Sequence, residues 1–244
     1  MESILIADAL NDPPKSILPD YLKWRKSTNN FNNFAASAII RSHCQGIRLG
    51  GKTVRSLLFS TDMALIEHYE ADAVLAVYPF PPSAKIIKTV IGFSEKPVVC
   101  GVGGGLTQGK VAVEMAKLAE DAGAAALIVN QPFKNKDIEM IKKSTTLPMI
   151  SSISHTGMDL RSRVEAGVDI FHITGGKATA AIVDYLCFAA PGYPLLATGG
   201  KEIETVGSVI AAGADGIVLT PPSSGELFKS IMDRYRSGYD YGKS

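Results

Sequence analysis

The sequence predicts an α/β protein, a single (β/α)8 barrel with an N-terminal helical extension. Eight short apolar runs alternate with helical stretches, and a junction of the Ala-Gly-Ala-Asp type recurs where helices meet strands. The 244 residues match the length of about 250 that is typical of such barrels. Residues 1–53 are assigned to the extension and residues 54–244 to the barrel. A doubly wound open sheet has the same local pattern and is the alternative fold.

The extension precedes the regular pattern. Asp20–Ser27 and Asn33–Ser42 are predicted helices, with Pro19 near the start of the first and an asparagine-rich break between them. Trp24 is interpreted as a packing residue. We expect this segment to pack on the barrel or against another subunit.

The barrel strands are predicted from near-continuous runs of Val, Ile, Leu and Ala, which are typical of a parallel sheet covered by helices. The eight predicted strands are Val54–Ser60, Ala73–Tyr78, Pro97–Val102, Ala125–Asn130, Pro148–Ser152, Asp169–Thr174, Leu195–Thr198 and Gly216–Thr220. The predicted helices among them include Ala84–Ile91, Lys110–Asp121, Thr156–Ala166, Lys201–Ala212 and Gly225–Arg236. Glycines such as Gly123, Gly167 and Gly213 are expected to end helices in the left-handed conformation, as a scaffold feature at the bottom of the barrel.

Composition narrows the function classes. Hydrophobic residues make up 46% and charged residues 20%, which allows a large core, and the net charge of +1 without a basic run argues against nucleic acid as a partner. No apolar run reaches the length of a membrane span, and the first residues do not have the pattern of a secretory signal. Cys44, Cys100 and Cys187 are scattered and odd in number, which favours a reducing compartment. We therefore expect a cytoplasmic protein.

Candidate catalytic residues follow the strands, because the chemistry of such barrels lies at the carboxyl ends of their strands. Asp62, His155 and His172 are the candidates for acid–base catalysis. Asp62 and His155 are equally well explained as capping or loop residues. His172 is expected in the barrel mouth, since Thr174 would share its face, although a histidine that faces the helices is the alternative.

Further polar residues at the strand ends are expected to line a substrate pocket. They are Tyr78, Cys100, Asn130, Ser152 and Thr174. Cys100 is included although its strand is more typical of a buried core thiol. The Gly103–Gly105 loop would admit a ligand close to the backbone, and no Walker motif follows it. The histidines and acidic residues lack a metal-ligand spacing, so no metal site is predicted.

The stretch from Pro194 to Leu227 predicts a phosphate site. Its two strands are followed by glycine- and serine-rich loops, and the loops after the last two strands often hold phosphate in such barrels. The predicted phosphate-binding residues are Gly175, Gly176, Lys177, Thr198, Gly199, Gly200, Thr220, Ser223 and Ser224. Lys177 and Lys201 each follow Thr-Gly-Gly, an internal repeat. The alternative is that these glycines only form tight turns and the lysines are surface residues.

The order strand, Thr-Gly-Gly, helix, Ala-Gly-Ala-Asp-Gly, strand resembles the phosphate-binding (β/α)8 superfamily. That group includes ketodeoxyphosphogluconate aldolases, thiamine-phosphate synthases and ribulose-phosphate-binding barrels, and the resemblance implies phosphate binding at Gly199, Gly200, Thr220 and Ser223. The Gly-Val-Gly-Gly-Gly loop and the segment Glu114–Asn130 also look like dihydrodipicolinate-synthase-type lyases. Both the aldolases and these lyases use a lysine on strand six, where this chain has His172 or Thr174.

These observations predict an enzyme that acts on a small phosphorylated or carboxylated metabolite, as a lyase or isomerase, without a required cofactor. An FMN-dependent oxidoreductase is an alternative, because the phosphate of that cofactor uses the same loops in related barrels. A non-catalytic metabolite-binding protein is a second alternative. The expected partners are an anionic small molecule and further copies of the chain in a homo-oligomer, with no nucleic acid and no membrane.

Overall fold

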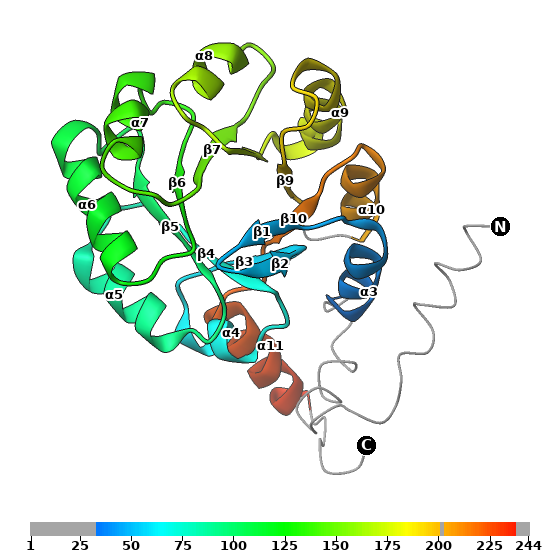
Figure 1. Ribbon diagram of the computed structural model, residues 1–244. Coiled ribbons are helices and arrows are strands. Elements are labelled where there is room, and N and C mark those ends of the chain that lie inside the picture. Colours follow the sequence, from blue (N-terminus) through cyan, green and yellow to red (C-terminus); the bar gives the residue numbers. More distant parts are fainter. Residues whose placement is uncertain (1–32, 201–202, 238–244) are drawn as a thin grey trace.

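The computed structural model describes residues 33–200 and 203–237, which form a closed barrel of eight parallel strands surrounded by helices (Figure 1). The barrel strands are β3 Ser56–Phe59, β4 Ala73–Ala76, β5 Val98–Gly103, β6 Ala126–Val129, β7 Met149–Ile153, β8 Ile170–Ile173, β9 Leu195–Thr198 and β10 Gly216–Leu219. Each pairs with the next along the chain, and β10 pairs with β3 to close the ring. The predicted (β/α)8 barrel is therefore confirmed, and the open sheet is excluded.

Helices follow the strands around the outside of the barrel. Their bounds are α4 Met63–His68, α5 Ala84–Phe93, α6 Gly109–Asp121, α7 Asn135–Lys142, α8 Leu160–Glu165, α9 Thr179–Ala189, α10 Ile203–Ala211 and α11 Ser224–Arg236, with a 3-10 turn η1 at Gly176–Ala178. The predicted helix from Thr156 starts later than expected, because Asp159 caps its first turn. Lys201 lies outside the described residues.

Two apolar layers result from the alternation of side chains along each strand. Leu57, Leu75 and Val99 point into the barrel, whereas their neighbours such as Leu58 and Val74 pack against the helices. The inward residues fill the barrel, as is usual for this fold. The last inward residue of each strand is thus placed at the carboxyl-terminal mouth.

The recurrent junction lies at the opposite end of the barrel. Gly167 and Gly213 have φ values of 103° and 106°, in the left-handed region expected where these helices end. The aspartates that follow accept backbone hydrogen bonds from the preceding strand: Asp169 from Met149 at 2.7 Å, and Asp215 from Leu195 at 2.8 Å. These carboxylates hold the strand starts in register.

A β-hairpin closes this lower end and corrects two sequence predictions. Strands β1 Ile47–Leu49 and β2 Lys52–Val54 pair antiparallel, so residues 1–53 are not purely helical and the predicted strand Val54–Ser60 is interrupted at Arg55. Ile47 and Leu49 join the apolar cluster of the barrel interior, and Figure 1 shows the hairpin lying across the barrel. The hairpin therefore seals the bottom of the barrel.

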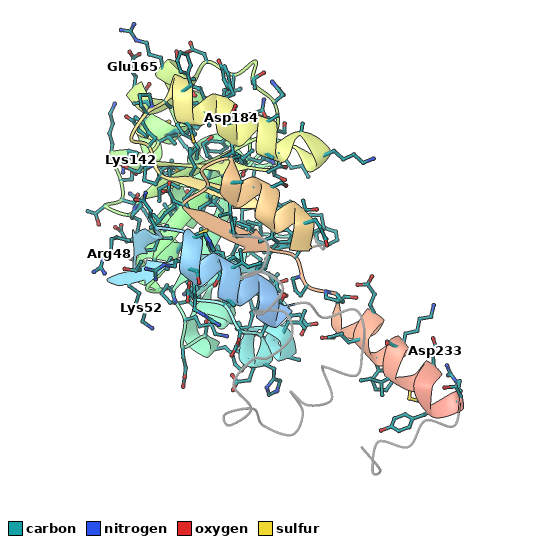
Figure 2. All side chains as sticks on the ribbon, turned by 90° about the vertical axis from the view of Figure 1, so that its right-hand side faces the viewer. Arg48, Lys52, Lys142, Glu165, Asp184 and Asp233 are labelled. Atoms are coloured by element: carbon teal, nitrogen blue, oxygen red, sulfur yellow. The ribbon has the colours of Figure 1, made fainter. Side chains whose placement is uncertain are left out.

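The helices at the two ends of the described chain have different surroundings. Helix α3 Asn33–His43, predicted from sequence, lies against α10 in the outer ring (Figure 1). Helix α11 extends away from the barrel in the side view of Figure 2, with Asp233 near its far end. The predicted helix Asp20–Ser27 and Trp24 lie outside the described residues. Among the helices described, none combines the length and the apolar character needed to span a bilayer.

Candidate functional site

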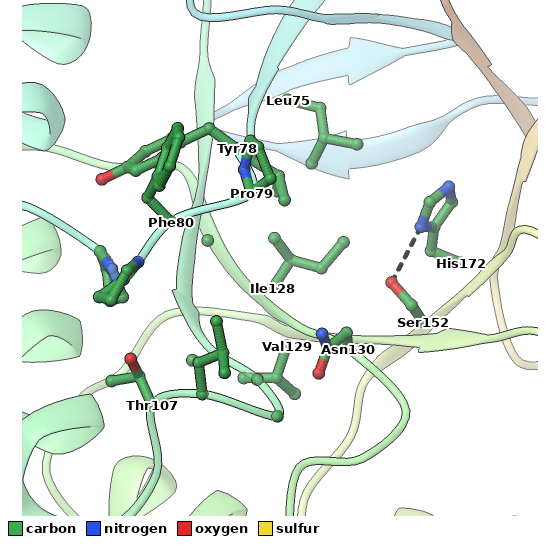
Figure 3. Close-up of a pocket in the computed structure, with 18 of the residues that line it drawn as sticks. Leu75, Tyr78, Pro79, Phe80, Thr107, Ile128, Val129, Asn130, Ser152 and His172 are labelled. Atoms are coloured by element: carbon green, nitrogen blue, oxygen red, sulfur yellow. Dashed lines mark hydrogen bonds between the residues drawn. The ribbon is translucent and has the colours of Figure 1, made fainter.

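A cavity of about 400 Å³ opens at the carboxyl-terminal mouth over strands β3 to β8 (Figure 3). Its apolar lining comes mainly from the loops after β4 and β5, with Phe59 at the end of β3. Its polar side chains are Tyr78, Thr107, Asn130, Ser152, His172 and Thr174. Of the described residues that line the cavity, none is Asp, Glu, Lys or Arg. The cavity is therefore apolar with a few neutral hydrogen-bonding groups, the usual character of a small-molecule site.

The apolar wall is built by the loop after β4. Tyr78 and the Pro79-Phe80-Pro81-Pro82 segment lead into α5, and the prolines restrict the backbone of this loop. The Ser83 backbone N–H donates to the Tyr78 hydroxyl oxygen at 2.6 Å, which ties that side chain to its own loop. In Figure 3 these aromatic rings lie on the side of the cavity away from His172.

The loop after β5 packs closely against Phe133 and Asn130 because its glycines have no side chains. A Cβ atom at Gly103 would lie 2.4 Å from the ring of Phe133, and one at Gly104 would lie 2.6 Å from the amide of Asn130. The Gly104 N–H donates to the carbonyl of Thr107 at 2.8 Å. These glycines thus bring the β5–α6 loop against Asn130, which lines the cavity.

His172 lies in the barrel mouth, as the sequence favoured. Its Nδ1 lies 3.1 Å from Ser152 Oγ on β7, and its Nε2 lies 3.1 Å from Thr198 Oγ1 on β9. Only 7% of His172 is exposed, and burial lowers its pKa from 6.5 to about 4. The ring is therefore neutral at pH 7, with one nitrogen accepting and the other donating to the two hydroxyls.

The other two catalytic candidates are not brought to His172. Asp62 is the N-cap of α4: it accepts from the backbone N–H groups of Ala64 and Leu65, and from the Ser224 hydroxyl. The Ser224 hydrogen bond, against the opposing effect of burial and with help from the backbone donors, holds the Asp62 pKa below its usual value. Neither Asp62 nor His155 lines the cavity.

His155 belongs to an exposed loop network. The Gln131 side-chain amide contacts its Nε2, and the Gly157 backbone N–H lies 3.2 Å from its Nδ1. Gln131 also accepts from the backbone and hydroxyl of Ser154, both at 2.7 Å. The structure therefore gives Asp62 and His155 the capping and loop roles that were the alternatives in the sequence.

The predicted pocket residues divide between the cavity and the core. Tyr78, Asn130, Ser152 and Thr174 line the cavity. Cys100 does not: it is fully buried in the layer between strands and helices, where burial raises the pKa of its thiol to about 12. The alternation along β5 explains this, because Val99 and Gly101 face inward. Sequence reasoning did not identify Phe59, Phe80 and Leu106 as lining residues.

Several donors of the predicted phosphate site are engaged within the protein. Gly199 N–H donates to the Val218 carbonyl at 3.0 Å, which continues the sheet. Ser223 N–H and hydroxyl donate to the Glu226 carboxylate at 2.8 and 2.9 Å, and Ser224 donates to Asp62. These donors are thus used within the protein, in the sheet and in two helix caps, and phosphate binding at the three residues stays a prediction.

The remaining predicted phosphate residues lie elsewhere at the mouth. Thr198 bonds to His172. Gly175 and Gly176 form the turn into η1, where the Gly175 and Gly176 carbonyls accept from Ala178 and Thr179. Lys177 is exposed, and Gly200 has a φ of 73° beside Thr205. Thr220 follows β10 and does not line the cavity. Phosphate binding at these positions stays a prediction.

Comparisons with known proteins identify the fold. No protein-family model and no curated protein sequence matches the chain. A solved phosphonopyruvate hydrolase complex with oxalate and Mg²⁺ is 15% identical, covers 82% of this chain and 86% of its own, and has a TM-score of 0.58. A 2,3-dimethylmalate lyase of the PEP mutase/isocitrate lyase superfamily is 11% identical, with 84% and 85% covered and a TM-score of 0.59.

A third structure belongs to the lyases that the sequence resembles. The 4-hydroxy-tetrahydrodipicolinate synthase of Methylacidiphilum fumariolicum SolV is 18% identical, covers 77% of this chain and 75% of its own, and has a TM-score of 0.56. At such identities these likenesses show the (β/α)8 fold alone and leave the activity open. The specific resemblance to ketodeoxyphosphogluconate aldolases and thiamine-phosphate synthases stays a prediction.

The cavity does not fit two groups: the Mg²⁺ bound by one of these neighbours and the lysine that the sequence resemblance implies. Mg²⁺ is bound through carboxylates, and the lining has none; in the part of the chain that the structure describes, no three His, Cys, Asp or Glu residues gather to hold a metal. Among the described residues the lining also contains no lysine for imine formation, and His172 stands on the sixth barrel strand. The described side chains that line the cavity are thus all neutral.

Proposed function

We propose that the chain is an enzyme that transforms a small carbonyl compound by proton transfer, as a lyase or isomerase. The observation that carries this proposal is His172, which is buried, neutral and bonded to Ser152 at the polar end of the cavity. All three solved structures compared above are named as enzymes, which supports a catalytic role over a binding role.

A neutral imidazole suits chemistry next to a carbonyl group. With Nδ1 protonated, the ring donates to Ser152 Oγ, and the Ser152 hydroxyl can in turn donate to the carbonyl oxygen and stabilise the charge that develops there when a neighbouring proton leaves. Its low pKa makes it a poor base, so its main role is to polarise the substrate. Solvent water at the mouth of the cavity takes the proton from carbon, and Thr198 fixes the ring from the other side.

Proton exchange into carbonyl compounds tests this proposal without knowledge of the natural substrate. The protein is incubated in D₂O with acetophenone, cyclohexanone and pyruvate, and loss of the proton next to each carbonyl is followed by NMR. Wild type is expected to accelerate exchange of at least one compound, and His172→Gln to lose at least tenfold of that rate. His43→Gln, on the exposed face of α3, is the matched control. Exchange that persists in His172→Gln would exclude this role.

The FMN alternative receives less support from the geometry. It relied on backbone and hydroxyl donors after β9 and β10 to hold a phosphate, and Gly199, Ser223 and Ser224 already bond to protein groups.

A further inference from the structure

We propose that the cavity takes an uncharged ligand, with an apolar or aromatic body against the β4 and β5 loops and a single carbonyl or hydroxyl group at Ser152 and His172. This inference rests on the proposed function for the placement of the reacting group. It departs from the anionic substrate expected from the sequence.

The first support is the distribution of side chains around the cavity. Phe80 and Leu106 form its rim and are 73% and 82% exposed, although both are large apolar residues. Such residues are stabilised when a ligand covers them. Figure 3 shows Phe80 on the side opposite to Ser152 and His172, so a ligand that touches both ends must be apolar at one end and polar at the other.

The second support is the lack of a counter-charge. Among the residues that the structure describes, no Lys or Arg lines the cavity, and His172 is neutral at pH 7 because burial lowers its pKa to about 4. A buried anion without a paired charge is strongly disfavoured. The polar groups that remain, among them Asn130 and Ser152, match a neutral carbonyl or hydroxyl group.

The third support comes from the helices that begin at the mouth. A helix N-terminus normally attracts anions. Four of these N-termini hold a carboxylate of the protein itself: Asp62 at α4, Asp137 at α6, Asp159 at α8 and Glu226 at α11. At α6, beside the cavity, the Gly109 N–H donates to the buried Asp137 at 3.0 Å. At these four helices, the position that would hold an anionic group is thus occupied.

Matched probes that differ in charge test the inference. Binding of acetophenone and cyclohexanone is compared with that of benzoate and cyclohexanecarboxylate, with pyruvate and inorganic phosphate as small anions, by ligand-observed NMR titration at pH 7. Each neutral probe is expected to bind at least tenfold more tightly than its carboxylate counterpart. Equal or tighter binding of the carboxylates would overturn the inference.

Rim variants show whether the probes occupy this cavity. Phe80→Ser and Leu106→Ser are expected to weaken binding of the neutral probes at least threefold. Phe188→Ser is the matched control, because Phe188 on α9 is 88% exposed and does not line the cavity. Neutral binding that is insensitive to both rim variants would place the ligand elsewhere and refute the inference.

The outcome is separable from that of the proposed function. Neutral probes that bind at the rim without any proton exchange would support the ligand class and contradict the enzymatic proposal. His172-dependent exchange of pyruvate, with no binding of neutral probes, would support the enzymatic proposal and contradict the ligand class.

Discussion

His172 is a buried residue that also lines the cavity where catalysis is proposed. Its two ring nitrogens bond to Ser152 and Thr198, so a buried polar side chain is satisfied without any charged partner. Such a satisfied network fixes one ring orientation. Burial of the ring among neutral groups makes its protonation costly, which gives a measurable dependence on pH.

Stability should fall when the pH is lowered from 7 to 4. The His172 pKa is about 4 in the folded state and near 6.5 when unfolded, so between these values the unfolded state binds more protons. The free energy of unfolding then decreases by up to about 3 kcal/mol through this group, and changes no further below pH 4. Urea unfolding at pH 7 and pH 5 measures the effect. His172→Gln should remove this part of the dependence, whereas His43→Gln should retain it.

The hydroxyl of Thr198 is predicted to hold the His172 ring. Thr198→Val keeps the volume and leaves His172 Nε2 without its partner at 3.1 Å, which should cost about 1–3 kcal/mol of stability. It should also slow proton exchange, because the ring loses its fixed orientation. Thr198→Ser should restore both properties. Thermal unfolding and the exchange assay provide the two measurements, and a Thr198→Val protein equal to wild type in both would contradict the role.

At the scale of elements, the β5–α6 loop can pack against Asn130 because Gly104 has no side chain. Gly104→Ala should displace Asn130, since the new Cβ would lie 2.6 Å from its amide, and should weaken probe binding several-fold. Gly92→Ala in α5 is the control, because nothing lies within 4 Å and alanine favours a helix by up to about 1 kcal/mol. Titration of acetophenone and urea unfolding distinguish the two variants.

The hairpin β1–β2 should contribute substantially to stability. Leu49 is 1% exposed and packs among the inward residues of the barrel, so Leu49→Ala should destabilise the protein by about 2–5 kcal/mol. Lys52→Ala, at an exposed position of the same hairpin, should change stability by less than about 0.5 kcal/mol. Equal unfolding midpoints for the two variants would show that the hairpin does not seal the core.

The sequence predicted the elements that are marked by a continuous local pattern of residues. It did not predict the hairpin, which is defined by the pairing of two strands. All eight barrel strands were predictable because each is a continuous apolar run. The hairpin had a readable signal as well: Gly50-Gly51 forms a two-residue turn between Leu49 and Lys52, both glycines with positive φ. The run from Val54 to Ser60 was instead interpreted as one strand, which concealed the break at Arg55.

The site was less accessible to sequence reasoning for the same physical reason. That Gly199 donates to Val218 depends on the pairing of two strands, which composition does not reveal. The hydrogen bonds between Ser223 and Glu226 could have been predicted, because Ser-x-x-Glu is the pattern of a capping box. Phe80 and Leu106 were overlooked because nothing in an apolar loop residue marks it as part of a cavity rim.

For the whole molecule, the bottom of the barrel is closed by the hairpin, the mouth holds the cavity, and α11 extends from the side (Figure 2). Leu227 packs against the core at the start of α11. Phe228 and Tyr235 are seven residues apart and share a different face of this helix, where they are 65% and 55% exposed. An exposed aromatic face on a projecting helix is typical of an association surface. We therefore propose that copies of the chain associate through α11, in line with the homo-oligomer expected from the sequence.

This association predicts a change in mass when the face becomes charged. Phe228→Lys combined with Tyr235→Lys should shift sedimentation from an oligomer to a species near the chain mass of 25.9 kDa. Phe188→Lys introduces the same charge at an exposed aromatic position on α9 and should leave the oligomer intact. Circular dichroism checks that α11 and the barrel remain folded. A wild-type protein that already sediments as a monomer would refute the proposal, because the charged face would then have no contact to break.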